Sequence, residues 1–220
     1  MAALTYQQLR TVVAELAQTL DAMQIDYAVM GGAAVCLTVG NADRMTEDVD
    51  LVIHVDQRMI TADRLTTKLL TEYPSKFAAV DQFGHTIPGY KLALPGGASS
   101  VVGLEVFDAA SWPQRPQYNV QAASRQTMNI NGHPVKVFAP EWILREKILS
   151  QYERQGGAKG RSDICDLINV VPFAVPGKPE LNFNNDEKLK SALSNLLQKH
   201  PELAPRLKEK ISCADVFGNW

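Results

Sequence analysis

The sequence predicts an α/β (α+β) fold, with a mixed β-sheet flanked by helices over 1–139 and a helical region over 140–220. Two observations in the first part indicate the sheet. Short apolar runs with strand character alternate there with segments of helical periodicity. Asn131-Gly132 stands between two such runs, which is a strong hairpin signal. In the second part the pattern is helical throughout, apart from a proline-containing loop over 172–179.

The individual elements follow from periodicity and turn residues. The first helix opens with a capping box, Thr5 with Gln8 three residues later, and keeps helical spacing to Met23. Pro88-Gly89 predicts a turn between two strands. The pattern predicts strands over 27–30, 49–55, 77–80, 90–94, 101–107, 128–130 and 135–138, and further helices over 33–39, 61–72, 141–155, 163–170 (capped by Ser162), 185–199 and 205–212.

Composition restricts the class of protein. A formal charge of −2 provides no global basic field, so any contact with nucleic acid would need a local patch. The three cysteines show no CxxC spacing, which argues against a disulfide framework or a zinc site. Cys36 and Cys165 lie in apolar helical patterns and are predicted core residues. Without a signal-peptide pattern or an apolar run near the ~20 residues of a membrane span, the expectation is a soluble cytoplasmic protein.

The most informative segment runs from 27 to 54. An apolar run ends in Gly31-Gly32, a short helical stretch follows, and Asp48-Val49-Asp50 opens the next apolar run. Strand residues two apart point the same way, so Asp48 and Asp50 project from one face, roughly 7 Å apart along the chain. Carboxylates this close repel unless a cation lies between them, and such oxygen ligands suit Mg²⁺. The Gly-Gly bend would let the backbone approach a triphosphate.

These residues resemble the signature of the nucleotidyltransferase superfamily, a Gly-Gly or Gly-Ser turn followed by Asp-x-Asp at the start of the next strand. The Arg-x-Thr-x-Asp-x-Asp form is most similar to the AbiEii-type and minimal nucleotidyltransferases, a group that includes toxins of bacterial toxin–antitoxin pairs and lincosamide-modifying enzymes. The chain departs from the pattern at Ala33, where a hydroxyl residue often binds a phosphate. The resemblance implies nucleotide-binding roles for Gly31, Gly32, Arg44 and Thr46. A salt bridge from Arg44 to Asp43 or Glu47 is the alternative role of that arginine.

A third carboxylate is needed to complete a two-metal site. Glu105 lies within an apolar run, where an unpaired charge would be expensive, and the superfamily usually has its third acid on such a strand. The resemblance therefore implies metal and catalytic roles for Asp48, Asp50 and Glu105. Alternatively, Glu105 pairs with Lys91 or faces solvent. Asp108 is the substitute, but it sits where the strand ends, where caps are common and water can reach it.

A second patch of resemblance lies in the helical part. A Pro-Glu start of a helix that carries Lys147 resembles the AbiEii-type pattern, and a following Arg/Lys…Asp-x-x-Asp element contains Arg161. The resemblance implies that Lys147 and Arg161 bind nucleotide. Asp163 and Asp166 share a helix face. They either cap the helix and complement its dipole, or order Lys147 or Arg161.

Taken together, these residues predict a metal-dependent nucleotidyltransferase that uses Mg²⁺, or Mn²⁺ as a substitute. It would move a nucleoside monophosphate from a nucleoside triphosphate to an acceptor hydroxyl of a small molecule, a protein or tRNA, releasing pyrophosphate. One alternative is a catalytically inactive nucleotide-binding or regulatory module of the same fold, which the alanine at 33 favours. Another is a toxin-like protein controlled by a partner. The aromatic residues Trp112, Tyr118 and Trp142 could stack on a base, but core packing is the expected role.

Overall fold

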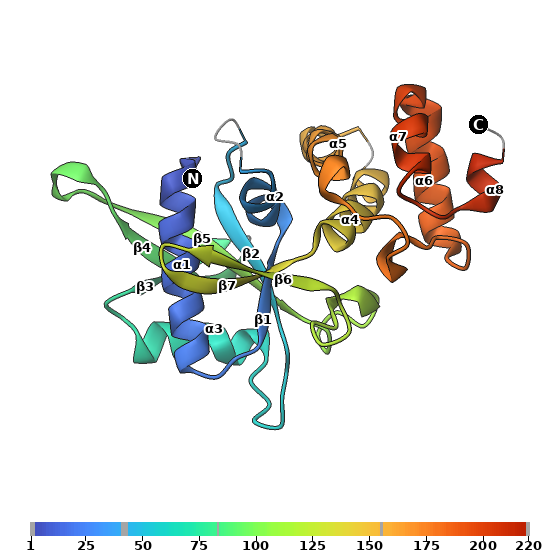
Figure 1. Cartoon of the computed structure of the whole chain (residues 1–220). Helices are drawn as coiled ribbons and strands as arrows, with labels where there is room; N and C mark the ends of the chain where they lie inside the picture. The colour runs from blue at the N-terminus through green and yellow to red at the C-terminus, as the bar shows by residue number, and fades with distance from the viewer. Residues whose placement is uncertain (1–2, 41–43, 83, 155, 219–220) are drawn as a thin grey trace. The chain divides into compact units, whose positions relative to one another are not determined.

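The computed structural model describes residues 3–40, 44–82, 84–154 and 156–218. Contacts between Cα atoms divide the chain into two compact units, Met1–Phe138 and Ala139–Trp220 (Figure 1). Compactness alone does not make a unit an independently folding domain, so the predicted division into domains at 139/140 stays a prediction. In the part of the chain that the structure describes, no helix is both long and apolar enough to cross a membrane.

The first unit opens with the predicted strand–helix–strand frame. Helix α1 (Tyr6–Ala22) has the predicted capping box, in which the backbone N–H of Gln8 donates to the Thr5 hydroxyl at 3.2 Å. It is followed by β1 (Tyr27–Met30), α2 (Gly31–Val39) and β2 (Asp48–Ile53). Helix α2 begins two residues earlier than predicted, because the two glycines form its first turn directly after the strand.

The next part contributes α3 (Ala62–Glu72), β3 (Phe77–Gln82), β4 (His85–Ala93) and β5 (Ser99–Asp108). The predicted turn at Pro88-Gly89 is wrong, because both residues lie inside β4 and pair with β3. The pairing of β4 with β5 starts at Gly89, so Pro88 lies just outside it. A proline is tolerated there because its missing N–H is not needed to pair with β5. A side chain at Gly89 would overlap the methyl groups of Val80 and Val101.

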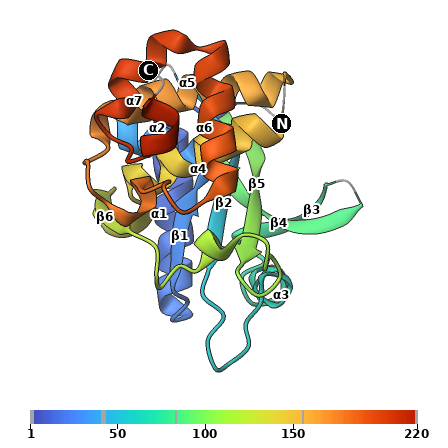
Figure 2. The same cartoon turned by 90° about the vertical axis from the view of Figure 1, so that its right-hand side faces the viewer.

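Seven strands form one mixed sheet in the order β3-β4-β5-β2-β1-β7-β6. The β2–β5 and β1–β7 pairs are parallel, and the other pairs are antiparallel. The last two strands, β6 (Arg125–Ile130) and β7 (His133–Phe138), form the predicted hairpin, with Asn131 at φ 54° and Gly132 at φ 82° in its turn. The opposite edge of the sheet is formed by β3, and the β3–β4 hairpin extends away from the helices of the first unit in Figure 2.

Helices α1, α2 and α3 each pack on a different set of strands. Helix α1 packs on β4, β6 and β7, and α3 packs on β3, β4 and β5. Helix α2 packs on β1 and β2, the strands that come directly before and after it in the chain. The mixed sheet flanked by helices confirms the predicted fold class, and it places β2 and β5 at the centre of the sheet.

The second unit consists of helices. They are α4 (Pro140–Glu153), α5 (Ala158–Val170), α6 (Glu187–Lys199), α7 (Ala204–Lys208) and α8 (Ala214–Phe217), with short 3₁₀ turns η3 (Val171–Phe173), η4 (Pro179–Leu181) and η5 (Pro201–Leu203). The predicted cap at Ser162 is wrong, because α5 begins at Ala158 and the Ser162 hydroxyl donates to the Ala158 carbonyl inside the helix at 3.3 Å. Cys36 is buried as predicted, but Cys165 is exposed, since the buried face of α5 carries its neighbour Asp166 instead.

Candidate metal centre and nucleotide site

Three carboxylates converge at the centre of the sheet. Parallel pairing of β2 and β5 places Asp50 directly beside Glu105, and Asp48 lies two residues earlier on the same face. One carboxylate oxygen from each of the three lies within 4.8 Å of the other two, and all three residues are half-buried. We call Asp48, Asp50 and Glu105 the carboxylate triad. Its all-oxygen donor set and close spacing fit a divalent metal ion.

Glu105 is oriented by a residue that the sequence did not single out. The side-chain amide of Gln82, on β3, donates a hydrogen bond to Glu105 Oε1. The predicted alternative, a pair between Glu105 and Lys91, is wrong because the Lys91 ammonium donates to the Pro74 carbonyl at 2.7 Å. No local signal in the sequence identifies Gln82, because it comes near Glu105 only through the pairing of β3 with β4 and of β4 with β5.

Asp108 has a structural role. It lies three residues after Glu105 and therefore points to the opposite face of the sheet. Its carboxylate accepts bonds from the Ala62 N–H at 2.9 Å, at the start of α3, and from the Ser111 N–H at 2.6 Å and hydroxyl at 3.0 Å. Asp108 is fully buried, so the expectation that water reaches it is wrong. The predicted capping role explains this burial, because three donors satisfy the charge.

The two glycines lie against the start of β2. Gly31 has φ +63°, and a Cβ built on it would overlap the carboxylate of Asp50. A Cβ on Gly32 would lie 2.8 Å from Thr46 Oγ1 and 2.9 Å from an Arg44 guanidinium nitrogen. Absence of side chains therefore lets the first turn of α2 approach the triad. The first N–H groups of a helix have no partner within the helix and favour an anion.

Thr46 carries a hydroxyl to this same place. It is buried, and its Oγ1 lies 3.3 Å from Asp48 Oδ1 and 3.2 Å from the Asp48 carbonyl. Its own carbonyl accepts the Leu4 N–H at 2.7 Å, which fixes the segment that leads into β2. The hydroxyl therefore stands between Gly32 and the triad.

The Arg44 guanidinium approaches Gly32 from the segment that precedes β2. It donates to the Met45 carbonyl, and a nitrogen lies beside Gly32 as described above. The alternative ion pair with Asp43 involves a position outside the described residues. Of the predicted nucleotide-binding residues, the structure thus brings Gly31, Gly32, Arg44 and Thr46 together at the triad.

We expect Gly31→Ala to weaken divalent-metal binding strongly, because its Cβ would displace the Asp50 carboxylate. The matched control is Gly97→Ala: Gly97 has a similar φ of +80°, but a Cβ there would meet nothing within 4 Å. Both variants bear the strain of a left-handed alanine, about 1–2 kcal/mol. Calorimetric titration with Mn²⁺ and thermal unfolding would separate the effects. Equal loss of metal affinity in both variants would contradict this role of Gly31.

Lys147 lies in a buried charged cluster of the second unit. Its ammonium contacts Asp163 Oδ1 at 2.8 Å and Asp166 Oδ2 at 2.7 Å, and Arg154 contacts Asp163 Oδ2 at 2.9 Å. The two aspartates therefore order Lys147 and do not cap α5. Arg161 is exposed, and its guanidinium donates a hydrogen bond to the Gly156 carbonyl at 3.2 Å. The implied nucleotide-binding roles of Lys147 and Arg161 stay predictions.

We expect Lys147→Ala to destabilise the protein by about 3–5 kcal/mol, because it removes the buried ammonium that contacts both Asp163 and Asp166 and leaves Asp163 with its contact to the more exposed Arg154. Lys159→Ala, at an exposed lysine of the same unit, is the control. Urea denaturation measures both changes. Weaker binding of a triphosphate than of a monophosphate to the remaining folded Lys147→Ala protein would support the implied nucleotide role. A destabilisation below about 1 kcal/mol would show that the cluster contributes little.

Comparisons with known proteins show which family the chain resembles. No protein-family model and no curated protein matches the sequence. A solved structure described as an antigenic nucleotidyltransferase-like protein from Paracoccidioides brasiliensis is 63% identical, with a TM-score of 0.94, over 99% of this chain and 100% of that one. More distant structures include the antibiotic-resistance factor ANT(2'')-Ia (15% identity, TM-score 0.48, 88% of this chain and 94% of that one) and the lincosamide antibiotic adenylyltransferase LnuA (13%, 0.40, 77% and 99%). On the strength of the 63% relative, the chain belongs to the nucleotidyltransferase-like proteins of the nucleotidyltransferase superfamily.

Proposed function

We propose that the protein is a metal-dependent nucleotidyltransferase that moves a nucleoside monophosphate from a nucleoside triphosphate to an acceptor hydroxyl, with release of pyrophosphate. The observation that carries the proposal is the carboxylate triad next to the glycine turn of α2. Three carboxylates within 4.8 Å repel one another unless a cation lies between them. Mg²⁺ is the cation that this donor set suits best, and Mn²⁺ is its usual substitute.

The three acids of the triad are assigned different roles according to their positions. Asp48 and Asp50 hold the cation at the start of β2. Glu105 accepts the proton of the acceptor hydroxyl, and the bond from Gln82 orients its carboxylate for this step. When bound, the cation would polarise the α-phosphate and neutralise the charge that develops on it. Because positioning and charge neutralisation suffice for phosphoryl-type transfer, the mechanism needs no covalent nucleophile.

The outer phosphates are assigned to the α2 side of the triad. Gly32 carries no side chain there, and the Arg44 guanidinium that lies against it supplies positive charge. The Thr46 hydroxyl lies beside Gly32 as well, and it would supply the hydrogen bond that Ala33 cannot by turning its one proton from Asp48 to a phosphate oxygen. A hydroxyl from this other segment is therefore proposed to replace the one that is missing at Ala33, which supports an active enzyme over an inactive module. The nucleotide-binding roles implied for Lys147 and Arg161 are part of the proposal.

The acceptor hydroxyl is proposed to belong to a small molecule, a protein or tRNA, and membership of the AbiEii-type branch is part of the proposal. The test uses nucleoside triphosphates labelled on the α-phosphate, Mg²⁺ or Mn²⁺, and cell extract as the source of acceptor. We expect metal-dependent release of pyrophosphate together with transfer of the label. Binding of triphosphate without release of pyrophosphate would favour the inactive regulatory module instead.

A further inference from the structure

A cluster of aromatic rings lies on the sheet next to the carboxylate triad. Phe107 follows Glu105 by two residues on β5 and pairs with Val52, in the same register that places Glu105 beside Asp50. Its ring therefore lies on the triad's face of the sheet. The centroid of the Trp112 ring lies 5.5 Å from that of Phe107, and the centroid of the Tyr118 ring lies 5.8 Å from it. We call Phe107, Trp112 and Tyr118 the aromatic cluster.

The cluster is open to solvent. Trp112 is 39% exposed, so its predicted role in core packing is wrong, and both Phe107 and Tyr118 are partly exposed. Trp112 and Tyr118 lie on the connection between β5 and β6 and lean on Phe107, which the sheet holds in place. An indole held in this way presents a large, rigid apolar surface to ligands at little further loss of side-chain entropy.

The position of the cluster along the strands determines what it meets. Thr46 and Arg44, assigned to the outer phosphates, come before the triad on the β2 side. Phe107 comes after the triad on β5, which runs parallel to β2. The two groups of residues therefore flank the triad at opposite ends. Phe107 is displaced from Glu105 by roughly 7 Å along the strand, since each strand residue advances about 3.3 Å.

A nucleoside triphosphate is a linear ligand, with its outer phosphates at one end and its nucleoside at the other. If the outer phosphates lie at Thr46 and Arg44 and the α-phosphate lies at the triad, the nucleoside extends toward the aromatic cluster. We propose that the aromatic cluster, and Trp112 above all, stacks on the nucleobase of the donor. This inference rests on the proposed function. Stacking is tolerant of base identity because every base has a π-face, and larger purines should bind more tightly than pyrimidines.

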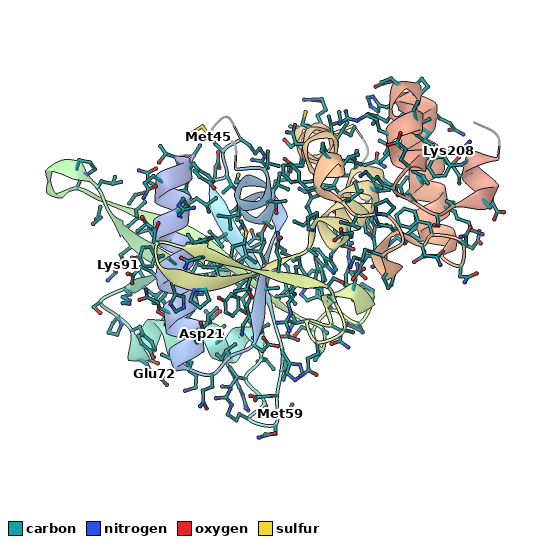
Figure 3. All side chains as sticks on the ribbon, viewed as in Figure 1. Asp21, Met45, Met59, Glu72, Lys91 and Lys208 are labelled. Carbon is teal, nitrogen blue, oxygen red and sulfur yellow. The ribbon has the colours of Figure 1, made fainter. Side chains whose placement is uncertain are left out.

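The test compares a nucleotide with a phosphate chain that has no base. Calorimetric titrations measure the binding of ATP, UTP and inorganic tripolyphosphate, each with Mg²⁺, to the full chain. We expect Trp112→Ala to weaken ATP binding about tenfold, as for the loss of one base–aromatic stack, and to leave tripolyphosphate binding unchanged. Trp112→Phe should restore most of the ATP affinity. Met59→Ala, which removes an exposed side chain at the loop between β2 and α3 (Figure 3), should change neither affinity.

The outcomes separate this inference from the proposed function. Equal weakening of ATP and tripolyphosphate would place Trp112 at the phosphates and overturn the inference. Unchanged ATP binding with slower label transfer would assign the cluster to the acceptor, and would overturn it too. If wild-type protein binds tripolyphosphate as tightly as ATP, the base site is wrong while the phosphate site stands. If it binds neither ligand, the proposed function itself fails and the inference fails with it.

Discussion

Replacing Asp48 or Asp50 with asparagine is expected to reduce metal-dependent turnover by at least about 100-fold, the scale of losing a main electrostatic contact at an active site. The fold should survive, because both residues are half-buried at the start of a strand and the change preserves their shape. Without metal, each variant should unfold at a higher temperature than wild type, since one of the mutually repelling carboxylates of the triad is gone.

Pyrophosphate release and thermal unfolding with and without Mg²⁺ would check both parts of this prediction. Wild-type protein should gain stability from the metal by mass action, and the two variants should gain much less. Asp81→Asn, at an exposed aspartate of β3, is the matched control and should behave as wild type. Full turnover in either Asp48→Asn or Asp50→Asn would show that the metal assignment is wrong.

The second large effect is expected from Glu105→Gln, which should abolish chemistry while leaving binding of triphosphate largely in place. Asp48 and Asp50 still hold a metal on the phosphates, but the amide cannot take the proton of the acceptor hydroxyl. Single-turnover measurement of label transfer, together with titration of a non-hydrolysable triphosphate, separates the two effects. Loss of binding in proportion to loss of turnover would reduce Glu105 to a metal ligand only.

Asp108→Asn provides the comparison with Glu105→Gln, and its expected result follows from the buried capping role. An amide in place of the carboxylate cannot accept from all three donors at Ala62 and Ser111, so the variant should lose about 2 kcal/mol of stability. Turnover per folded molecule should stay near that of wild type, because Asp108 points away from the triad. Wild-type stability in urea together with lost turnover would reverse the roles of Glu105 and Asp108.

Local signals in the sequence were sufficient for much of the first unit. The capping box at Thr5, the strand over 27–30 and the Asn131-Gly132 turn each depend on residues a few positions apart, and the structure has all three. The convergence of Asp48 and Asp50 follows from strand alternation alone. These features were predictable because neighbours along the chain decide them.

Features decided by distant pairing were not predictable from local signals. The placement of Glu105 beside Asp50 was expected only through the family resemblance, because it depends on the register of two parallel strands. The bond from Gln82 depends on the pairing of β3 with β4 and was not expected at all. The burial of Asp108 depends on the start of α3 meeting the end of β5. Helical periodicity predicted that Cys165 is buried. In the structure the buried face of this helix carries Asp166 instead, because its carboxylate pairs with the buried Lys147, and a hydrophobic pattern does not reveal such a pair.

We propose that Asp48, Asp50 and Glu105 together hold a metal ion on the phosphates of a nucleoside triphosphate. A crystal structure with Mn²⁺ and a non-hydrolysable triphosphate measures this directly, because the anomalous signal of manganese locates the ion. We expect the ion to lie about 2.1 Å from an oxygen of each of the three carboxylates and to contact the α-phosphate. A triphosphate bound away from the triad, or an ion that Glu105 does not reach, would contradict this assignment of the metal site.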